Sequence, residues 1–341
     1  MKKLTLTVLL IATLSTTACS EQKINEWACG SKFGQTRCLN LAEKAYNNKD
    51  YEKFKKYLEI SSNYGNAQAQ ASLGMFYQQT DEKLGEKDYQ KALYWLQKSA
   101  EQGNKYGQSA LADMYSNAWG VKQDYSKAFE LYKKSAEQGD MRSQFHLGVM
   151  YAKGYATQQD DAKALEWYRK SAEQGYANAQ VALGLRYKNG KGVQQDEMQA
   201  NQWFEKAIKK YKQSAEQDSD AQFRLGEMYR NGWGVEKDYA LALQWYQKAA
   251  EKKHPDAQGS IGELYDEGLG VEQNYELAFQ WYEKAANQGF PRGQYAIADM
   301  YENGQGVEKN LTKAKEYYEM ACNGGLERSC NKLKELQETK S

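Results

Sequence analysis

Apolar and small residues recur at helical spacing in two blocks between Asp256 and Gly289. The first block contains Ile261, Gly262 and Tyr265. The second block contains Leu277, Ala278, Trp281, Tyr282 and Ala285. Residues at this spacing share one face of a helix, so the stretch predicts two helices that bury facing sides.

The break between the blocks predicts a tight turn. It reads Gly268-Leu269-Gly270-Val271, and glycine adopts positive φ at little cost. Asn274 stands where a side chain caps the start of the second helix. Gly289 follows that helix, as a glycine often does where a helix ends. The stretch therefore predicts one helical hairpin.

The same pattern returns along the chain. Its marker is Leu-Gly, Leu-Ala, Ile-Gly or Ile-Ala followed three residues later by Tyr, and the Gly or Ala positions are Gly74, Ala112, Gly148, Gly184, Gly226, Gly262 and Ala298. The steps from Ala112 to Gly148 and from Gly148 to Gly184 are 36 residues each, in the range of helical solenoids. A small marker residue lets paired helices approach closely.

The full pattern resembles the Sel1-like repeat, a relative of the tetratricopeptide repeat. It reads Ala-x-x-x-Leu-Gly-x-x-Tyr, then Gly-x-Gly-Val, Asp/Asn-Tyr-x-x-Ala, Trp-Tyr-x-Lys-Ala-Ala and a closing Gly. The resemblance implies an all-α fold, an α-solenoid in which helix-turn-helix repeats stack into a right-handed superhelix. It also implies a family that mostly works by holding other proteins.

The repeats organise most of the chain. Residues 29–65 are predicted to form a degenerate N-terminal capping repeat, residues 66–325 seven Sel1-like repeats, and residues 326–341 a C-terminal capping helix and tail. The repeat around Gly184 carries extra residues, because Trp203–Ala215 is seven residues longer than its counterpart Trp167–Ala172. We expect the second helix of that repeat to project further.

The N-terminus predicts export. Residues 1–18 form a signal peptide, with Lys2 and Lys3 before an apolar run. The sequence Thr17-Ala18-Cys19 resembles a bacterial lipobox, which implies lipidation of Cys19, although Thr16 replaces the usual Leu and ordinary cleavage after Ala18 is the alternative. Residues 19–28 would be a tether. Ser20 resembles the sorting pattern for the outer membrane, so we expect an envelope lipoprotein facing the periplasm.

Charge excludes some partners. The chain has a formal net charge of +1, which falls to about −1 once Lys2 and Lys3 are removed. Neither value favours nucleic acid or an anionic membrane surface. Contact with a membrane is therefore expected only through the lipid anchor.

Four cysteines remain beside Cys19, and they form two close pairs at the two ends of the repeats: Cys29 with Cys38, and Cys322 with Cys330. In an oxidising compartment such pairs predict two disulfides. The spacing of Cys322 and Cys330 is also similar to that of cysteine-rich Sel1-like proteins, where a bridge joins one repeat to the next. Two pairs of free thiols are the alternative.

No catalytic constellation or metal site is evident, and no cofactor is expected. His146 is predicted on a first helix and His254 at the end of a second helix, and neither stands near a suggestive nucleophile or acid. Glutamine recurs four residues before each marker, for example Gln108, Gln144 and Gln258. We expect these glutamines to make hydrogen bonds between helices, with binding of a peptide backbone as the alternative.

The positions three before, one after and four after each marker form one stripe at helical spacing. In tetratricopeptide-like repeats this stripe lines the concave groove. Its predicted apolar anchors are Phe145, Val149, Val181, Leu185 and Phe223, and its C-terminal part adds Glu227, Glu263, Asp266, Tyr295, Asp299 and Glu302. The acidic part favours a partner with a basic segment. Packing of the apolar members against neighbouring helices, with a solvated acidic face, is the alternative.

These observations favour a non-enzymatic, envelope-anchored scaffold that binds a protein or peptide in its concave groove. Some lipoproteins with Sel1-like repeats resemble immunity proteins that neutralise secreted antibacterial toxins, and this is a narrower form of the same hypothesis. A weak β-lactam or cell-wall hydrolase, as suggested for cysteine-rich Sel1-like proteins, is the enzymatic alternative. A host-interaction factor at the cell surface is a third.

Overall fold

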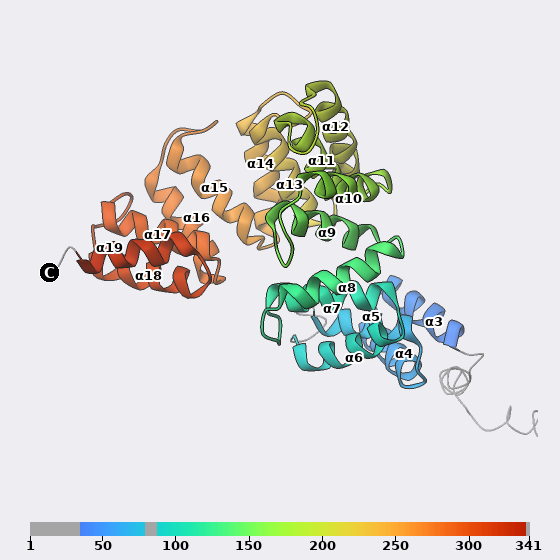
Figure 1. Ribbon diagram of the computed structural model, residues 1–341. Coiled ribbons are helices and arrows are strands. Elements are labelled where there is room, and N and C mark those ends of the chain that lie inside the picture. Colours follow the sequence, from blue (N-terminus) through green and yellow to red (C-terminus); the bar gives the residue numbers. More distant parts are fainter. Residues whose placement is uncertain (1–34, 79–86, 339–341) are drawn as a thin grey trace, which may run out of the picture. The chain divides into compact units, whose positions relative to one another are not determined.

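The computed structural model describes residues 35–78 and 87–338, and the regular elements within them are helices packed in sequential pairs (Figure 1). This arrangement is the predicted α-solenoid. The chain divides into two compact units, Met1–Gln174 and Gly175–Ser341, which we call the N-terminal unit and the C-terminal unit. The predicted signal peptide (1–18), Cys19, the tether (19–28) and Cys29 lie outside the described residues.

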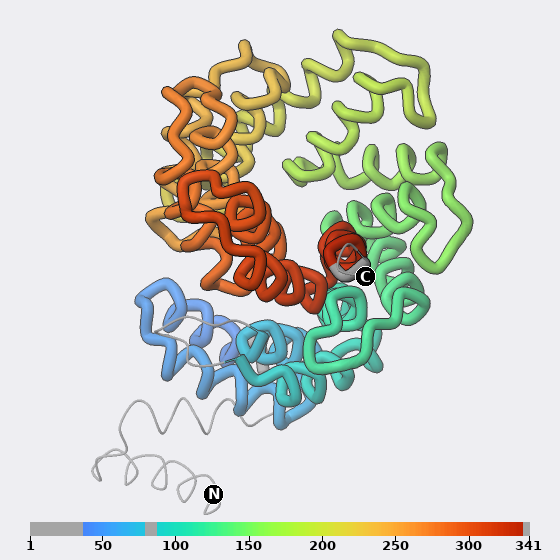
Figure 2. Tube along the Cα trace, turned by 90° about the vertical axis from the view of Figure 1, so that its left-hand side faces the viewer, coloured from blue at the N-terminus to red at the C-terminus, as the bar shows by residue number. Residues whose placement is uncertain are grey.

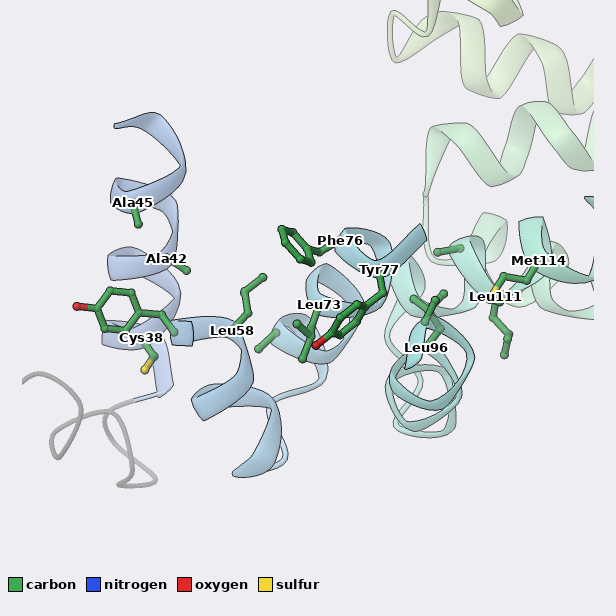
Figure 3. Close-up of a cluster of buried hydrophobic side chains, with 14 residues drawn as sticks. Cys38, Ala42, Ala45, Leu58, Leu73, Phe76, Tyr77, Leu96, Leu111 and Met114 are labelled. Carbon is green, nitrogen blue, oxygen red and sulfur yellow. The ribbon is translucent and has the colours of Figure 1, made fainter. Parts of the chain in front are cut away.

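Within its described residues, the N-terminal unit has four helix pairs, α3/α4, α5/α6, α7/α8 and α9/α10. The bounds are α3 Gln35–Asn47, α4 Tyr51–Asn63, α5 Ala67–Gln78, α6 Tyr89–Glu101, α7 Lys105–Asn117, α8 Tyr125–Glu137, α9 Met141–Lys153 and α10 Asp161–Glu173. The first pair corresponds to the predicted capping repeat. Its core continues into the next pairs, because Cys38, Leu58, Leu73, Leu96 and Met114 form one buried cluster (Figure 3).

The C-terminal unit consists of four more pairs and a single last helix, which follow one another along the trace in Figure 2. The bounds are α11 Ala177–Asn189, α12 Glu197–Ser214, α13 Ser219–Asn231, α14 Tyr239–Glu251, α15 Pro255–Glu267, α16 Tyr275–Asn287, α17 Pro291–Asn303, α18 Leu311–Asn323 and α19 Glu327–Glu338. Helix α19 packs on α18, as predicted for a C-terminal cap.

Four of the marker glycines, Gly148, Gly184, Gly226 and Gly262, let an aromatic ring lie against the first helix of their pair, and Gly74 does the same for Leu96. A Cβ atom added at Gly226 would stand 2.4 Å from Cε1 of Tyr246, and one added at Gly262 would stand 2.6 Å from Tyr282. Both distances are too short for real contacts. The predicted reason for the small residue, close approach of the paired helices, is therefore confirmed.

The turn within each pair follows the predicted chemistry. Gly268 and Gly270 have φ of 68° and 71°, and the Asn274 side chain accepts a hydrogen bond of 2.9 Å from the backbone N–H of Leu277. Gly270 also allows a close approach between repeats, because an added Cβ there would lie 2.6 Å from the Cβ of Tyr239 in the preceding pair. Gly289 has φ of 78° directly after the C-cap of α16, which confirms its predicted place.

The recurring glutamines connect neighbouring helices, which confirms the inter-helix prediction. The Gln144 amide nitrogen donates to the Ala136 carbonyl in the last turn of the preceding second helix. Its amide oxygen accepts from Gln174, at the end of the second helix of its own repeat, at 2.7 Å. Gln70 makes the same two bonds, to Ser62 and from Gln102.

Helix α12 carries the predicted insertion, but the extension is shorter than expected. The helix has 18 residues, where the other second helices of the C-terminal unit have 13, a difference of five. The rest of the predicted seven is not helical, because Ala215–Gln217 form the turn into α13. Tyr211 in the extension donates a hydrogen bond to the Asn178 side chain, which fastens the projecting end to α11.

The structure describes one of the two predicted disulfides in full and one cysteine of the other. Cys322 and Cys330 form a disulfide that joins α18 to α19, with their Cα atoms 4.9 Å apart. Cys38 is also disulfide-bonded, and its predicted partner Cys29 lies outside the described residues. The C-terminal bridge closes the exposed end of the solenoid, where fraying is easiest.

Candidate functional site

The C-terminal unit contains two neighbouring cavities over its first helices. Their volumes are about 840 Å³ and about 470 Å³, and they share Phe223, Glu227, Asp256, Phe290 and Arg292. We call them the large cavity and the small cavity. Helices α13, α15 and α17 supply most of the lining of the small cavity, which lies on the face where the sequence predicted a groove. Residues of α11, α12 and the N-caps of first helices supply most of the lining of the large cavity.

The structure brings six of the predicted groove residues into these cavities. Phe223 and Glu227 line both, and Glu263, Asp266, Tyr295 and Asp299 line the small cavity. They come from three consecutive first helices. The stripe at positions three before, one after and four after the marker therefore does face a hollow in this unit.

The other predicted anchors are not in the cavities. Val181 and Leu185 are half-buried and pack against the cluster formed by α11, α12 and α13. Phe145 and Val149 are half-buried on α9 of the N-terminal unit, where the Phe145 ring lies 5.8 Å from that of Tyr168. These four residues therefore fit the alternative of packing against neighbouring helices.

The acidic stripe residues have partners within the fold that the sequence analysis missed. Glu227 accepts a hydrogen bond from the Tyr246 hydroxyl at 2.9 Å, Glu302 accepts one from Tyr318 at 2.8 Å, and Asp266 accepts a longer one from Tyr282. Each donor is the second residue of the Trp-Tyr or Tyr-Tyr pair in the following second helix. The spacing of 16 or 19 residues between the acid and this tyrosine could have predicted the hydrogen bond from sequence. Burial and the adjacent carboxylates raise the pKa of these tyrosines, which keeps the hydroxyls as donors.

Basic side chains also approach the acidic stripe. Arg230 forms an ion pair of 2.6 Å with Glu263, and Lys332 of α19 lies 3.2 Å from Glu302. The guanidinium of Arg328 covers the Tyr295 ring, 4.0 Å from its centre. Helix α19 therefore covers the C-terminal end of the stripe. Glu302 contacts Tyr318 and Lys332 within the fold.

The large cavity has a charge character that the stripe did not predict. Lys210, Arg224 and Arg292 line it together with Asp218, Asp220 and Asp256. These residues lie in the extension of α12 and near the N-terminal ends of first helices, outside the three stripe positions. The groove is therefore mixed in charge at that end, while the small cavity remains predominantly acidic.

His254 lies in the large cavity but is poorly placed for catalysis. It is the N-cap of α15, rather than the end of a second helix as predicted, because its Nδ1 accepts the Ala257 backbone N–H at 3.2 Å. Its Nε2 lies 2.8 Å from Asp220 Oδ1, and this hydrogen bond lowers the pKa of Asp220. Both ring nitrogens are thus engaged, so neither is available to accept a substrate proton.

His146 belongs to a buried network in the N-terminal unit. Asp113 accepts hydrogen bonds from the Tyr132 hydroxyl at 2.5 Å and from Arg142 at 2.6 Å. The His146 ring stacks on Tyr132 with 5.0 Å between ring centres. Burial lowers the pKa of His146, against the opposing effect of Asp113. The lowered pKa favours the neutral imidazole, which packs on the Tyr132 ring.

Within residues 35–78 and 87–338, no three His, Cys, Asp or Glu side chains are grouped so that they could hold a metal ion. In the same part of the chain, every helix is too short or too polar to cross a membrane.

The family model described as "Sel1 repeat" matches this chain seven times, at residues 67–104, 105–140, 142–176, 177–218, 219–254, 255–290 and 291–326. The matches begin after the pair α3/α4 and end just before α19. No curated protein sequence matches the chain.

Several solved structures are similar. A Sel1 repeat protein from Oxalobacter formigenes is 31% identical, over 74% of this chain and 96% of that chain, with a TM-score of 0.50. A protective antigen of uropathogenic Escherichia coli with an SLR fold is 32% identical, over 82% of this chain and 66% of that chain, with a TM-score of 0.44. An immunity protein from Pseudomonas aeruginosa is 20% identical, over 62% of this chain and 81% of that chain, with a TM-score of 0.45.

Proposed function

Because this chain belongs to the Sel1 repeat family, whose repeats generally mediate protein–protein interactions, we propose that it is a non-enzymatic scaffold that binds a protein or peptide partner. The observation that carries the proposal is the pair of cavities over α13, α15 and α17. Six residues selected from sequence as a groove line them, and their aromatic and charged side chains are of the kinds that anchor protein interfaces.

The contacts of the polar groups in the cavities support the non-enzymatic part of the proposal. Among the residues that line the large cavity, His254 is the usual candidate for a general base, yet its two nitrogens are occupied by Ala257 and Asp220. The carboxylate of Glu227 in turn holds the Tyr246 hydroxyl. These groups position one another and leave little free capacity for proton transfer.

The partner segment is proposed to be basic where it meets the small cavity. Five carboxylates line this cavity, from Glu227, Asp256, Glu263, Asp266 and Asp299, against three arginines. Complementary charge mainly accelerates association and selects the partner. The proposal therefore concerns specificity as well as affinity.

The charge-reversed variant Glu263→Lys/Asp299→Lys tests the proposal. The mature chain and this variant are used to capture partners from the producing bacterium, and the affinity of each captured protein is then measured by calorimetry. A true partner is expected to bind the variant at least about tenfold more weakly, because two attractive charges become repulsive. Glu283→Lys, an exposed change on the second helix α16, is the matched control and should leave affinity unchanged.

Equal affinity for the native chain and the charge-reversed variant would contradict groove binding. If the partner is a secreted antibacterial toxin, the immunity form of the proposal is the correct one. Turnover of a β-lactam by the purified chain would instead favour the enzymatic alternative.

We also propose that the chain is anchored in the bacterial envelope through Cys19 and faces the periplasm. The support is the lipobox-like Thr17-Ala18-Cys19 after a signal-like N-terminus. Mass spectrometry of the N-terminal peptide from the producing cell is expected to show a mature chain that begins with a lipid-modified Cys19. An unmodified N-terminus at Cys19 would show ordinary cleavage after Ala18 and remove the anchor.

A further inference from the structure

Gly259 lies on the stripe of α15 and lines the small cavity. The corresponding residues of the other repeats are Ala71, Ser109, Phe145, Val181, Phe223 and Tyr295. Glycine inside a helix lowers stability relative to alanine, because it has more backbone freedom to lose. A glycine at this position therefore needs a reason.

Helix packing does not supply that reason. A Cβ added at Gly259 would lie 3.4 Å from Cε1 of Phe290, which is an ordinary contact. At the marker Gly262, in the next turn of the same helix, an added Cβ would lie 2.6 Å from Tyr282. The fold requires glycine at 262, whereas at 259 it would accept alanine. What glycine provides at 259 is a stretch of the cavity wall without a side chain, beside the Phe290 ring.

Phe290, next to Gly259, also stands where a polar capping residue would stabilise the helix better. It occupies the N-cap position of α17 and makes no side-chain capping hydrogen bond. Asn104 and Asp140 occupy the same position in earlier repeats, and both accept backbone N–H groups. Helix α17 thus gives up a favourable cap for an aromatic ring. A glycine inside a helix and an N-cap without a polar side chain thus line the same cavity. Residues that disfavour the local structure in this way are typical of binding sites.

The remaining lining of the small cavity indicates the kind of group that fits. The rings of Phe223, Tyr282, Phe290 and Tyr295 contribute its aromatic surface. Of its three arginines, Arg230 is paired with Glu263, Arg328 lies on Tyr295, and Arg292 has no carboxylate within ion-pair distance among the described residues. Within the described part of the chain, Asp256 and Asp299 have no basic side chain within ion-pair distance. Aromatic faces and unneutralised carboxylates together attract a cationic side chain.

The electrostatics of Asp266 agree with an excess of negative charge. Burial, and after it the carboxylates of Glu267, Asp299 and Glu263, raise the pKa of Asp266 against the opposing Tyr282 hydrogen bond. A cation placed among these groups would relieve their mutual repulsion.

We propose that the space at Gly259, bounded by Phe290, Tyr295, Asp256 and Asp299, is a specificity pocket for one arginine or lysine side chain of the partner. We call it the Gly259 pocket. The inference rests on the proposed scaffold function and adds to it the position and the chemistry of one anchor. The small cavity that contains this pocket has a volume of about 470 Å³, within the range of about 300–1,000 Å³ for ligand pockets, which leaves room for the side chain and its flanking backbone.

The first experiment uses capped pentapeptides of the form Ala-Ala-X-Ala-Ala and the full mature chain, with binding followed by saturation-transfer NMR and titration. With arginine or lysine at X, we expect affinity at least about tenfold higher than with citrulline or norleucine, which keep the length but lack the charge. Equal affinity for arginine and citrulline would overturn the proposal.

Two substitutions at Gly259 separate the pocket from the fold. Gly259→Leu is expected to reduce binding of the arginine peptide at least about tenfold, because its side chain fills the pocket. Gly259→Ala should bind more weakly than the native chain while melting at the same or a higher temperature. Unchanged binding by a folded Gly259→Leu variant would overturn the proposal.

A charge pair completes the test. Asp299→Asn is expected to weaken the arginine peptide, whereas Glu283→Gln, on the exposed face of α16, should not. Binding of the partner captured from the bacterium distinguishes the scaffold function from the Gly259 pocket. If that partner is lost by Glu263→Lys/Asp299→Lys but retained by Gly259→Leu, the scaffold function stands and the Gly259 pocket is excluded.

Discussion

Replacing Gly226 by valine is expected to lower the free energy of unfolding of the C-terminal unit by about 3 kcal/mol. An added Cβ would lie 2.4 Å from the Tyr246 ring, and that ring is fully buried. Tyr246 cannot move without breaking its hydrogen bond to Glu227, so either the helices α13 and α14 separate or the bond is lost. Urea unfolding measured by circular dichroism, with hydrogen exchange to locate the change in α13 and α14, tests this.

Alanine at the same position provides the graded control. Repeats with Ala112 and Ala298 as markers still bury Tyr132 and Tyr318, so alanine at 226 should cost less than valine. Gly259→Ala, in the neighbouring helix pair, is the control for a glycine that packing does not require. If Gly226→Val unfolds at the same urea concentration as the native chain, Tyr246 can move aside and the explanation of the marker is wrong.

Replacing Asp113 by alanine is expected to destabilise the N-terminal unit by about 3 kcal/mol. Asp113 is only 2% exposed and receives both the Tyr132 hydroxyl and the Arg142 guanidinium. Without the carboxylate, the buried hydroxyl loses its acceptor and a small cavity remains. Arg142 is half-exposed and can turn to water, so most of the loss comes from Tyr132. Hydrogen exchange of α7 and α8 during urea unfolding measures the change.

Two variants divide the effect between the partners of Asp113. Asp113→Asn keeps an oxygen that can accept from Tyr132 and should cost less than alanine, while Tyr132→Phe leaves the ion pair with Arg142 in place and should cost about 1 kcal/mol. A loss below about 1 kcal/mol for Asp113→Ala would show that the network is solvated and contributes little.

Much of the fold was predictable because its causes are local. Asn274 as a cap, Gly268 and Gly270 in the turn, and Gly262 against Tyr282 all follow from residue types within one repeat. The inter-helix role of the glutamines followed from their recurrence before every marker. The end of the long helix α12 departed from expectation, because part of the inserted sequence forms a turn instead of a helix, and His254 did so as the N-cap of α15.

The groove was predicted in part because its stripe obeys the same periodicity. Phe223 and Asp299 of the stripe line the small cavity, but the periodicity could not distinguish them from Val181 and Leu185, which pack against a neighbouring helix. Contacts between repeats, such as that of Arg230 with Glu263, depend on how successive pairs stack. Phe290 was missed because it stands at a helix start, outside the stripe.

The glutamine bonds also bear on the stiffness of each unit. In the N-terminal unit, Gln70, Gln108 and Gln144 each accept a bond from a glutamine at the end of the following second helix. In the C-terminal unit Gln258 does so, whereas the amide oxygens of Gln222 and Gln294 have no partner within the described residues, since Lys252 and Gly324 replace the donor. A stack of helix pairs bends where neighbouring helices are joined by fewer hydrogen bonds. We therefore expect the C-terminal unit to bend more readily beside Gln222 and Gln294 than beside Gln258.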